Sequence, residues 1–162
     1  MGRYATPEYR PADKPLPELE RSIVLENSRM TLTSAPSPCP FCTLPASRMV
    51  EENAHAVLIL DGYPVSPGHS LVIPKRHVRS FFEVTAPERE ALFALLDRAK
   101  ELVAEQHRPD GYNIGINDGA AAGQTVPHLH IHLIPRYDGD QADPRGGVRW
   151  VIPEKADYWT GR

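Results

Sequence analysis

The sequence predicts an α+β domain in which one long helix packs against an antiparallel sheet. Several short apolar segments have the length, β-branched content and flanking turn residues of strands, and one longer segment has helical periodicity. The strands fall on both sides of this helix along the chain, instead of alternating with several helices. This order of elements favours a single helix packed on an antiparallel sheet.

Four strands are predicted, two on each side of the helix. The segments before it are 54–61 and 69–75, and those after it are 111–118 and 126–135. Each is 7 to 10 residues long, rich in Val, Ile and Leu, and bounded by Gly, Pro or Asp.

The long helix is marked at both ends. Thr85 and Glu88 form a capping-box pattern at its start, and Arg108-Pro109 should end it near His107. Between these ends, apolar residues recur at helical spacing: Leu92, Leu95, Leu96, Ala99, Leu102 and Val103. The helix therefore has one apolar face to place against the sheet.

Composition divides the chain into two parts. Residues 1–22 are rich in proline and charged residues, with too little apolar content to fold alone, and are predicted to form an extended arm. Residues 23–162 are predicted to form the folded domain, which is long enough to bury a hydrophobic core without cross-links.

Charge and hydropathy limit the partners. The net charge of −3 gives no basic surface for duplex nucleic acid, whose non-specific binding depends on clustered Lys and Arg. No segment approaches the roughly 18 apolar residues of a membrane span, and the first residues lack the apolar centre of a signal peptide. We therefore expect a cytosolic protein that binds neither duplex nucleic acid nor a membrane.

Three of the seven histidines alternate along the last predicted strand, at His128, His130 and His132. In a strand they share one face. A water-facing polar row is one explanation, although Lys, Thr or Glu would serve equally well there. A neighbouring pair of these histidines could share one zinc. One ion shared by all three is excluded, because a strand rise of about 3.3 Å puts the outer two Cα atoms roughly 13 Å apart, whereas zinc ligands lie about 3.5 Å apart. At least one histidine therefore has a separate role.

The residues before this strand suit an anion. Gly119 and Gly123 allow tight turns, and Asn117, Gln124 and Thr125 add polar side chains. Backbone N–H groups in such a loop can surround a phosphate. A neutral imidazole nearby can attack phosphorus while donors stabilise the developing charge. Local turn bonding is the alternative for these polar side chains.

Taken together, these segments resemble the histidine triad family. Residues 128–134 match its motif of three histidines alternating with apolar residues, and 117–126 are similar to the loop that leads into it. Residues 61–75 are also similar, and the resemblance covers about residues 38–137. It implies a homodimeric α+β nucleotide hydrolase.

The resemblance implies a role for each matched residue. His130 would attack the α-phosphorus and form a nucleotidyl-histidine intermediate that water hydrolyses, and His132 would contact the phosphate and manage the leaving group's proton. The substrate-binding positions would be Asp61, His69, Asn117, Gly123, Gln124 and Thr125. The substrate would be a dinucleoside polyphosphate, such as diadenosine tetraphosphate, or a nucleoside phosphoramidate.

Two alternatives remain at this point. A nucleotide-binding sensor or scaffold with little turnover is the competing function, although binding alone needs no nucleophile and so does not explain His130. For Asp61, a turn role in its Asp-Gly-Tyr-Pro sequence is as consistent with the residues as contact with a ribose.

Cys39 and Cys42 form an isolated Cys-x-x-Cys pair. A redox dithiol would need a βαβ context that the predicted order of elements does not supply, and one pair is only half of a zinc site. The resemblance implies the other half, a histidine after the Pro-Lys strand end and the first triad histidine, which are His77 and His128 here. A structural zinc is therefore expected, with metal-free thiols as the alternative.

The segment after the triad holds Arg145, Arg149 and Trp150 around paired glycines. These side chains could reach across a site, or they could simply pack on the sheet.

Overall fold

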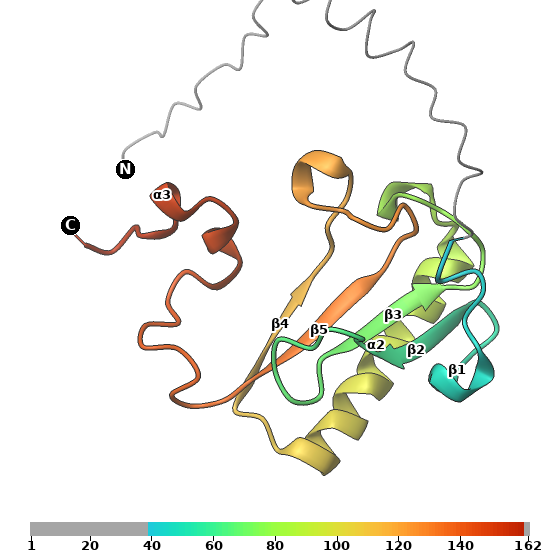
Figure 1. Cartoon of the computed structure of the whole chain (residues 1–162), viewed down its shortest axis with the longest axis horizontal. Coiled ribbons are helices and arrows are strands. Elements are labelled where there is room, and N and C mark those ends of the chain that lie inside the picture. Colours follow the sequence, from blue (N-terminus) through green and yellow to red (C-terminus); the bar gives the residue numbers. More distant parts are fainter. Residues whose placement is uncertain (1–38, 161–162) are drawn as a thin grey trace, which may run out of the picture. The chain divides into compact units, whose positions relative to one another are not determined.

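A computed structural model describes residues 39–160, and shows one five-stranded sheet in this range (Figure 1). The strands are β1 (Met49–Glu52), β2 (Ala56–Leu60), β3 (Ser70–Pro74), β4 (Gly111–Gly115) and β5 (Ile131–Arg136). Their order is β1-β2-β3-β5-β4, and each neighbouring pair is antiparallel. With the long helix α2 (Ala86–His107), this confirms the predicted α+β class.

Shorter elements complete the described part of the chain. Four are 3₁₀ turns: η1 (Ala46–Arg48), η2 (Phe81–Glu83), η3 (Ala120–Ala122) and η4 (Gly147–Val151). The short helix α3 (Pro153–Ala156) follows η4 in the C-terminal segment. The predicted arm at 1–22 lies outside the described residues.

β2, β3 and β4 are one to three residues shorter at their ends than predicted, and two larger differences concern β1 and β5. β1 was not predicted; it is an edge strand with alternating half-buried and exposed positions and two glutamates. The last strand was predicted over 126–135, but β5 begins only at Ile131, because the preceding residues bond to a loop instead of a neighbouring strand: the Leu129 N–H donates to the Val78 carbonyl at 2.7 Å.

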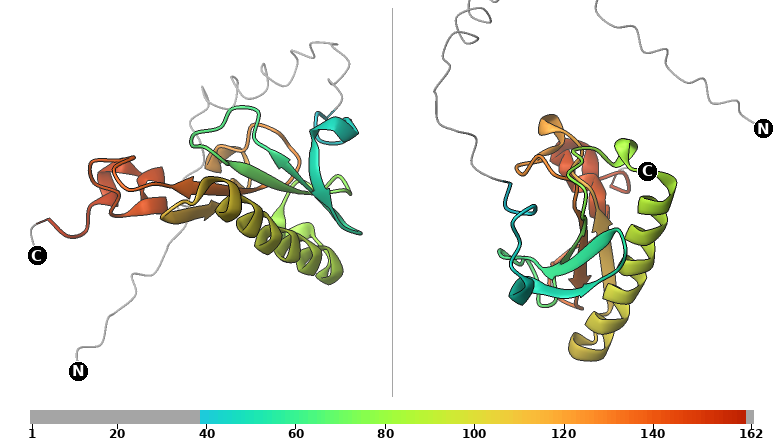
Figure 2. Two further views of the ribbon diagram at one scale, coloured as in Figure 1. Left: turned by 90° about the horizontal axis from the view of Figure 1, so that it is seen from below. Right: turned by 90° about the vertical axis from the view of Figure 1, so that its right-hand side faces the viewer.

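The two faces of the sheet carry different cores. Figure 2 shows α2 lying along one face, where buried residues of the strands and helix form the larger core: Ala56, Leu58, Val72, Leu92, Leu95, Leu96, Ala99, Val103, Leu129, Ile131 and Leu133. The opposite face has a smaller apolar cluster of Val57, Ile59, Leu71 and Ile73, with Phe41, Leu44 and Met49 packed against it. The triad histidines belong to this second face, since Leu129, Ile131 and Leu133 point to the helix.

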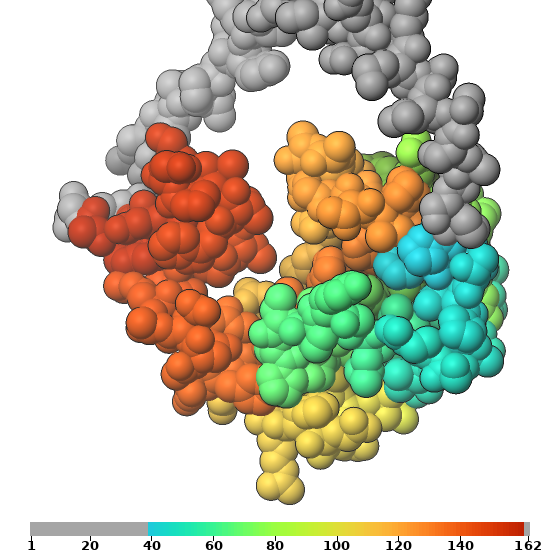
Figure 3. All heavy atoms as spheres, viewed as in Figure 1, coloured from blue at the N-terminus to red at the C-terminus, as the bar shows by residue number. Residues whose placement is uncertain are grey.

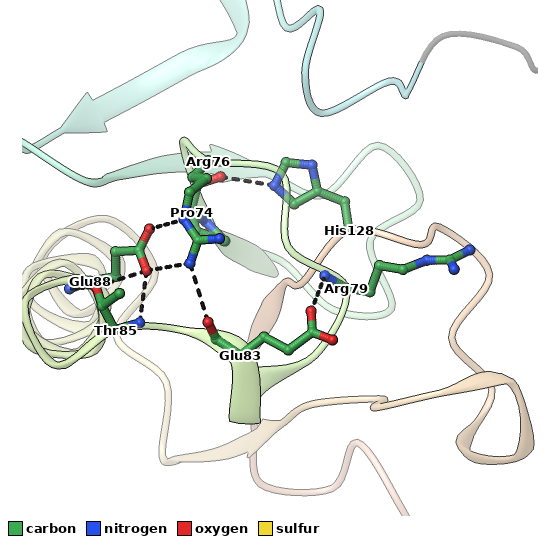
Figure 4. Close-up of polar contacts among 7 residues, drawn as sticks. All are labelled: Pro74, Arg76, Arg79, Glu83, Thr85, Glu88 and His128. Carbon is green, nitrogen blue, oxygen red and sulfur yellow. Dashed lines mark hydrogen bonds and ion pairs between the residues drawn. The ribbon is translucent and has the colours of Figure 1, made fainter.

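The start of α2 is fixed as its sequence predicts. The Thr85 hydroxyl accepts from the Glu88 N–H, and the Glu88 carboxylate accepts from the Thr85 N–H at 2.8 Å. Glu88 also forms a two-bond ion pair with Arg76, at 2.6 and 2.8 Å, which ties the helix to the end of β3 (Figure 4). Among the described residues, no helix combines the length and apolar content that a membrane crossing requires.

Candidate functional site

The triad histidines lie at the start of β5 in three different environments. His128 is fully buried, His130 is 7 % exposed and His132 is half-buried. The alternation predicted from the sequence persists even though regular pairing begins only at Ile131, because Leu129 and Ile131 are both buried against the helix side. The three rings therefore share the face opposite α2.

The His130 ring is held by its own chain. Its Nδ1 lies 2.8 Å from the His128 carbonyl oxygen, and because that oxygen can only accept, Nδ1 carries the proton. In the neutral ring this leaves the lone pair on Nε2. The Phe41 ring meets His130 edge-on at a centroid distance of 5.3 Å. This arrangement presents one unprotonated nitrogen in a fixed direction, as a nucleophile requires.

A second chain of contacts fixes His132. The Val65 N–H donates to His69 Nδ1 at 3.3 Å, so the neutral His69 ring carries its proton on Nε2. That Nε2 lies 3.0 Å from His132 Nδ1 and 3.4 Å from Asp61 Oδ2. His132 Nδ1 is thus the acceptor, and its own proton is on Nε2, available to donate to a bound group.

The protonation of these rings follows from burial. Desolvation, together with the neighbouring His130 and His69, lowers the pKa of His132 to about 4, against the opposing effect of Asp61. Desolvation also lowers the pKa of His69, and again Asp61 acts in the opposite direction. At neutral pH both rings are therefore neutral, which is the state that the hydrogen-bond directions require.

Asp61 takes the turn role that the sequence allowed, and its contact with a ribose stays a prediction. One carboxylate oxygen accepts the Tyr63 N–H at 2.8 Å and closes the turn, as expected for an aspartate before glycine. The other oxygen faces His69 Nε2 at 3.4 Å. The turn therefore positions the carboxylate beside the triad, with its second oxygen near His69 and His132.

The loop before the triad is held by side chains at both ends. Gln124 Oε1 accepts the Gly119 N–H at 2.9 Å, and its amide nitrogen donates to the Arg79 carbonyl at 2.8 Å. Asp118 accepts from the Ser80 hydroxyl and the Phe81 N–H. The structure leaves Gly123 and Thr125 exposed and Asn117 half-buried. The loop is therefore anchored independently of any ligand.

The structure brings the four predicted metal ligands together. The Sγ of Cys42 lies 3.2 Å from His77 Nδ1 and 3.5 Å from His128 Nδ1, and the Sγ of Cys39 lies 3.4 Å from His128 Nδ1. All four donor atoms lie within 4.8 Å of one another. A tetrahedral zinc with bonds of about 2.0–2.3 Å places its ligand atoms roughly 3.4–3.8 Å apart, so the donor set and its spacing fit zinc.

His128 is oriented for this role by the end of β3. Its Nε2 lies 2.9 Å from the Pro74 carbonyl oxygen and donates to it (Figure 4), so the lone pair is on Nδ1 and faces the two cysteines. A histidine that binds a metal commonly donates its other N–H to such a carbonyl.

Comparison with known proteins agrees with these features. The HIT domain family matches residues 45–139. The chain belongs to the HIT family. An uncharacterised HIT-like protein of Mycoplasma genitalium is 38% identical over 106 residues, which cover 63% of this chain and 75% of that protein. Solved HIT structures have the same fold.

Two relatives bear on the chemistry. A bis(5'-adenosyl)-triphosphatase of Saccharomyces cerevisiae is 38% identical over 99 residues, or 60% of this chain, which spans only 45% of the length of that enzyme. The crystal structure of a zinc-bound histidine triad family protein from Mycobacterium smegmatis is 37% identical, with a TM-score of 0.59, over 65% of this chain and 80% of that chain. The HIT fold and a likeness to a nucleotide hydrolase are therefore both established.

Sequence reasoning missed several contacts that shape this site. The carbonyls of Pro74 and Arg79 and the Val65 N–H are backbone groups, and no residue pattern marks them. The position of Phe41 inside the Cys-x-x-Cys pair marks it as close to the predicted site. Its contact with His130 depends on the folded position of that turn.

Proposed function

We propose that this HIT protein hydrolyses a nucleotide bonded through its α-phosphate, using His130 as nucleophile. The observation that carries the proposal is the His130 Nδ1 to His128 carbonyl hydrogen bond of 2.8 Å, which leaves Nε2 unprotonated in a nearly buried ring. A sensor or scaffold that only bound nucleotides would need no such orientation.

The reaction has two displacements. In the first, the Nε2 lone pair forms a bond to the α-phosphorus and the bond from phosphorus to the leaving oxygen or nitrogen breaks, so the leaving group takes that electron pair. In the second, a water oxygen attacks phosphorus and releases a proton to solvent, the P–N bond breaks, and Nε2 regains its lone pair. The products are a nucleoside monophosphate and the leaving group, with His130 unchanged.

His132 is the donor in this scheme. Its Nε2–H points away from the His69 contact and can bond to a phosphate oxygen or to the departing atom. A bound phosphate brings negative charge next to the ring and raises its pKa from about 4, so the ring becomes a better proton carrier only when substrate is present. His69 and Asp61 hold this ring in the required tautomer.

The remaining positions complete the nucleotide site. We place the Asn117 side chain, the Gly123 backbone and Thr125 around the phosphate oxygens, and the second oxygen of Asp61 at the ribose hydroxyls. Gln124 already uses both ends of its amide within the protein, so its part is to hold the loop in shape. Negative charge on the non-bridging phosphate oxygens would meet preformed donors there.

The substrate we favour is a dinucleoside polyphosphate such as diadenosine tetraphosphate, with a nucleoside phosphoramidate second. Support for this order comes from the similarity to the yeast bis(5'-adenosyl)-triphosphatase. A zinc held by Cys39, Cys42, His77 and His128 would fix the N-terminal turn and one end of the triad segment. A homodimer, which the sequence resemblance implies, and the cytosolic location expected from the sequence are also part of the proposal.

The test is kcat/KM for diadenosine tetraphosphate, adenosine phosphoramidate and an adenylyl-sugar control, for wild type and His130→Ala. Loss of the nucleophile should reduce turnover by about 10³-fold or more, while nucleotide binding is largely kept. His55→Ala is the matched control, because His55 is exposed and its side chain is remote from the triad in sequence. Wild-type binding without turnover of any substrate would favour the sensor function instead.

A further inference from the structure

The C-terminal segment borders an open cavity that the proposed chemistry does not use. Its volume is about 780 Å³, within the range of ligand pockets. Figure 3 shows the hollow between this segment, coloured red, and the sheet. Ile134 and Arg136 line the cavity from β5, Val65 and Ser66 from the turn before β3, and Trp150 and Trp159 from the C-terminal segment.

This cavity continues the face that carries the triad. Side chains two and four residues beyond His132 on β5 point the same way, so Ile134 and Arg136 follow it along one face at roughly 7 and 13 Å. Val65 and Ser66 also line a smaller cavity of about 470 Å³ that includes Asp61 and His69. A ligand extending from His132 along β5 would therefore enter the larger cavity directly.

Specific hydrogen bonds hold the residues around this cavity. The Tyr137 hydroxyl donates to the Pro67 carbonyl at 2.9 Å, and the Trp150 indole N–H donates to the Arg145 carbonyl at 2.8 Å. The Arg136 guanidinium donates to the Asn113 side-chain oxygen at 2.6 Å. These bonds use the Tyr137 hydroxyl and the Trp150 indole N–H, while the Trp150 ring remains half-exposed.

The charges of the lining argue against an oligophosphate inside the cavity. Arg136 pairs with Asp140 and Arg145 with Asp143, each at 2.7 Å, and Asp157 adds a further negative charge. Both arginines are therefore neutralised, and the lining carries an excess of carboxylate. Such a surface suits a neutral group with amino and hydroxyl donors.

Aromatic rings and an unpaired hydroxyl indicate what kind of neutral group fits. Both tryptophans of the chain line the cavity. Nucleobases stack on such rings, with each stacking contact contributing about 1–3 kcal/mol. The Ser66 hydroxyl is buried and has no hydrogen-bond partner among residues 39–160, and a buried polar group of this kind normally has one.

We propose that this cavity, beyond the His132 end of the triad, binds the nucleoside of the leaving group of a dinucleoside polyphosphate. This inference depends on the proposed hydrolase function for its kinetic consequence. The phosphate chain would remain at the 117–125 loop, and the second base would stack on Trp150 beside Ile134.

Fluorescence gives a test that is independent of turnover. Because the only two tryptophans line the cavity, intrinsic tryptophan emission reports on it alone. Adding ATP, which carries the expected leaving nucleoside, should quench this emission saturably, whereas inorganic tripolyphosphate at the same concentration should not. Trp150→Phe should remove a large part of the quenched signal. Equal responses to ATP and tripolyphosphate, or no response to either, would overturn the proposal.

Kinetics then separate this inference from the proposed function. Trp150→Ala should lower kcat/KM for diadenosine tetraphosphate by roughly 5- to 100-fold, the range expected for one lost stacking contact. It should change adenosine phosphoramidate turnover less than about twofold, since ammonia leaves no base to stack. Val151→Ala is the matched control, because Val151 is the exposed neighbour of Trp150 and does not line the cavity.

Each outcome has a distinct meaning. If the wild type hydrolyses neither substrate, the proposed function fails and the fluorescence titration alone judges the cavity. If Trp150→Ala reduces both substrates equally, or neither, the leaving-group site is refuted while the hydrolase proposal stands. Trp150→Phe, which keeps a stacking ring, should retain most of the wild-type rate and excludes simple misfolding as the cause.

Discussion

His128 and His132 lie four residues apart on one segment and both carry their proton on Nε2, yet their surroundings give the two rings different uses. His128 donates through Nε2 to the Pro74 carbonyl and directs the Nδ1 lone pair at two cysteines. His132 accepts at Nδ1 from His69 and keeps its proton on Nε2. One ring is arranged as a metal ligand and the other as a hydrogen-bond donor to a substrate.

The difference between the two ends shows that the partner atom, and not the residue type, decides what an imidazole does. A carbonyl can only accept, so it forces the adjacent nitrogen to be a donor. The backbone N–H of Val65 has the reverse effect through His69. His130, between them, again faces a carbonyl and has its lone pair on Nε2. Changes at each end should therefore have separable consequences.

The largest effect is expected from breaking the His128 end. Cys39→Ser removes one of four donors, and with it most of the zinc affinity. Zinc present at about 1,000 times its dissociation constant would stabilise the fold by about 4 kcal/mol, so its loss should lower Tm by roughly 8–16 °C. Differential scanning calorimetry and metal analysis of the purified protein measure both quantities.

A chelator provides the control for this prediction. It should lower the Tm of the wild type towards that of Cys39→Ser and leave the variant unchanged. Thr43→Ser is the matched exposed substitution, since Thr43 lies beside the pair but offers no metal ligand. If the purified wild type contains no zinc, and added zinc does not raise its Tm, the cluster holds reduced thiols instead.

The second effect is expected at the His132 end. His69→Ala removes the donor that fixes the tautomer of His132, so kcat should fall roughly 10- to 100-fold, as for other changes to a group that orients a catalytic histidine. KM should change little, because the phosphate contacts remain. His69→Gln, whose amide N–H can replace the donor, should recover part of the rate.

Zinc content and Tm distinguish this loss of activity from misfolding of the variant. His69→Ala should leave zinc content and the chelator-dependent part of Tm unchanged, since His69 has no contact with the cysteine cluster within hydrogen-bond range. A variant that lost zinc together with activity would show that the two ends are not separable.

The sequence predicted those features that depend on local rules. The capping box at Thr85 and Glu88, the end of the helix at His107 and the alternation from His128 to Leu133 all follow from neighbouring residues, and all are present. The clustering of Cys39, Cys42, His77 and His128 was expected only through the family resemblance, because its members are up to 89 residues apart.

What the sequence could not predict depends on contacts between distant segments. β5 starts at Ile131 because Leu129 bonds to a loop carbonyl, and Gln124 is occupied by the Arg79 carbonyl 45 residues away. The C-terminal cavity is the clearest case. Trp150 could have packed on the sheet, and only the bond between Tyr137 and Pro67, with the turn at the paired glycines, shows that this segment leaves a space there.

The smallest effect is expected at the ion pair of Arg76 and Glu88. This pair lies next to Pro74, whose carbonyl accepts from His128. The hydrogen bond from Arg76, helped by the Thr85 N–H, lowers the pKa of Glu88 from 4.5 to about 2 (Figure 4). A carboxyl whose pKa is lower in the folded state stabilises the fold above pH 4.5, and this stabilisation is lost as the pH falls towards 2. Because Arg76 is half-exposed, solvent screens the pair, and we expect about 1–2 kcal/mol.

Glu88→Gln should therefore lower the free energy of unfolding at pH 7 and have much less effect near pH 2, as measured by urea unfolding across this range. Glu90→Gln, an exposed position on the same helix, is the matched control. Glu88→Gln should also affect the two ends of the triad differently. Since Arg76 lies two residues after Pro74, the variant should weaken zinc retention at His128 slightly while leaving kcat within about twofold. A loss of kcat well beyond twofold would mean that the ion pair of Arg76 and Glu88 also supports the His132 end.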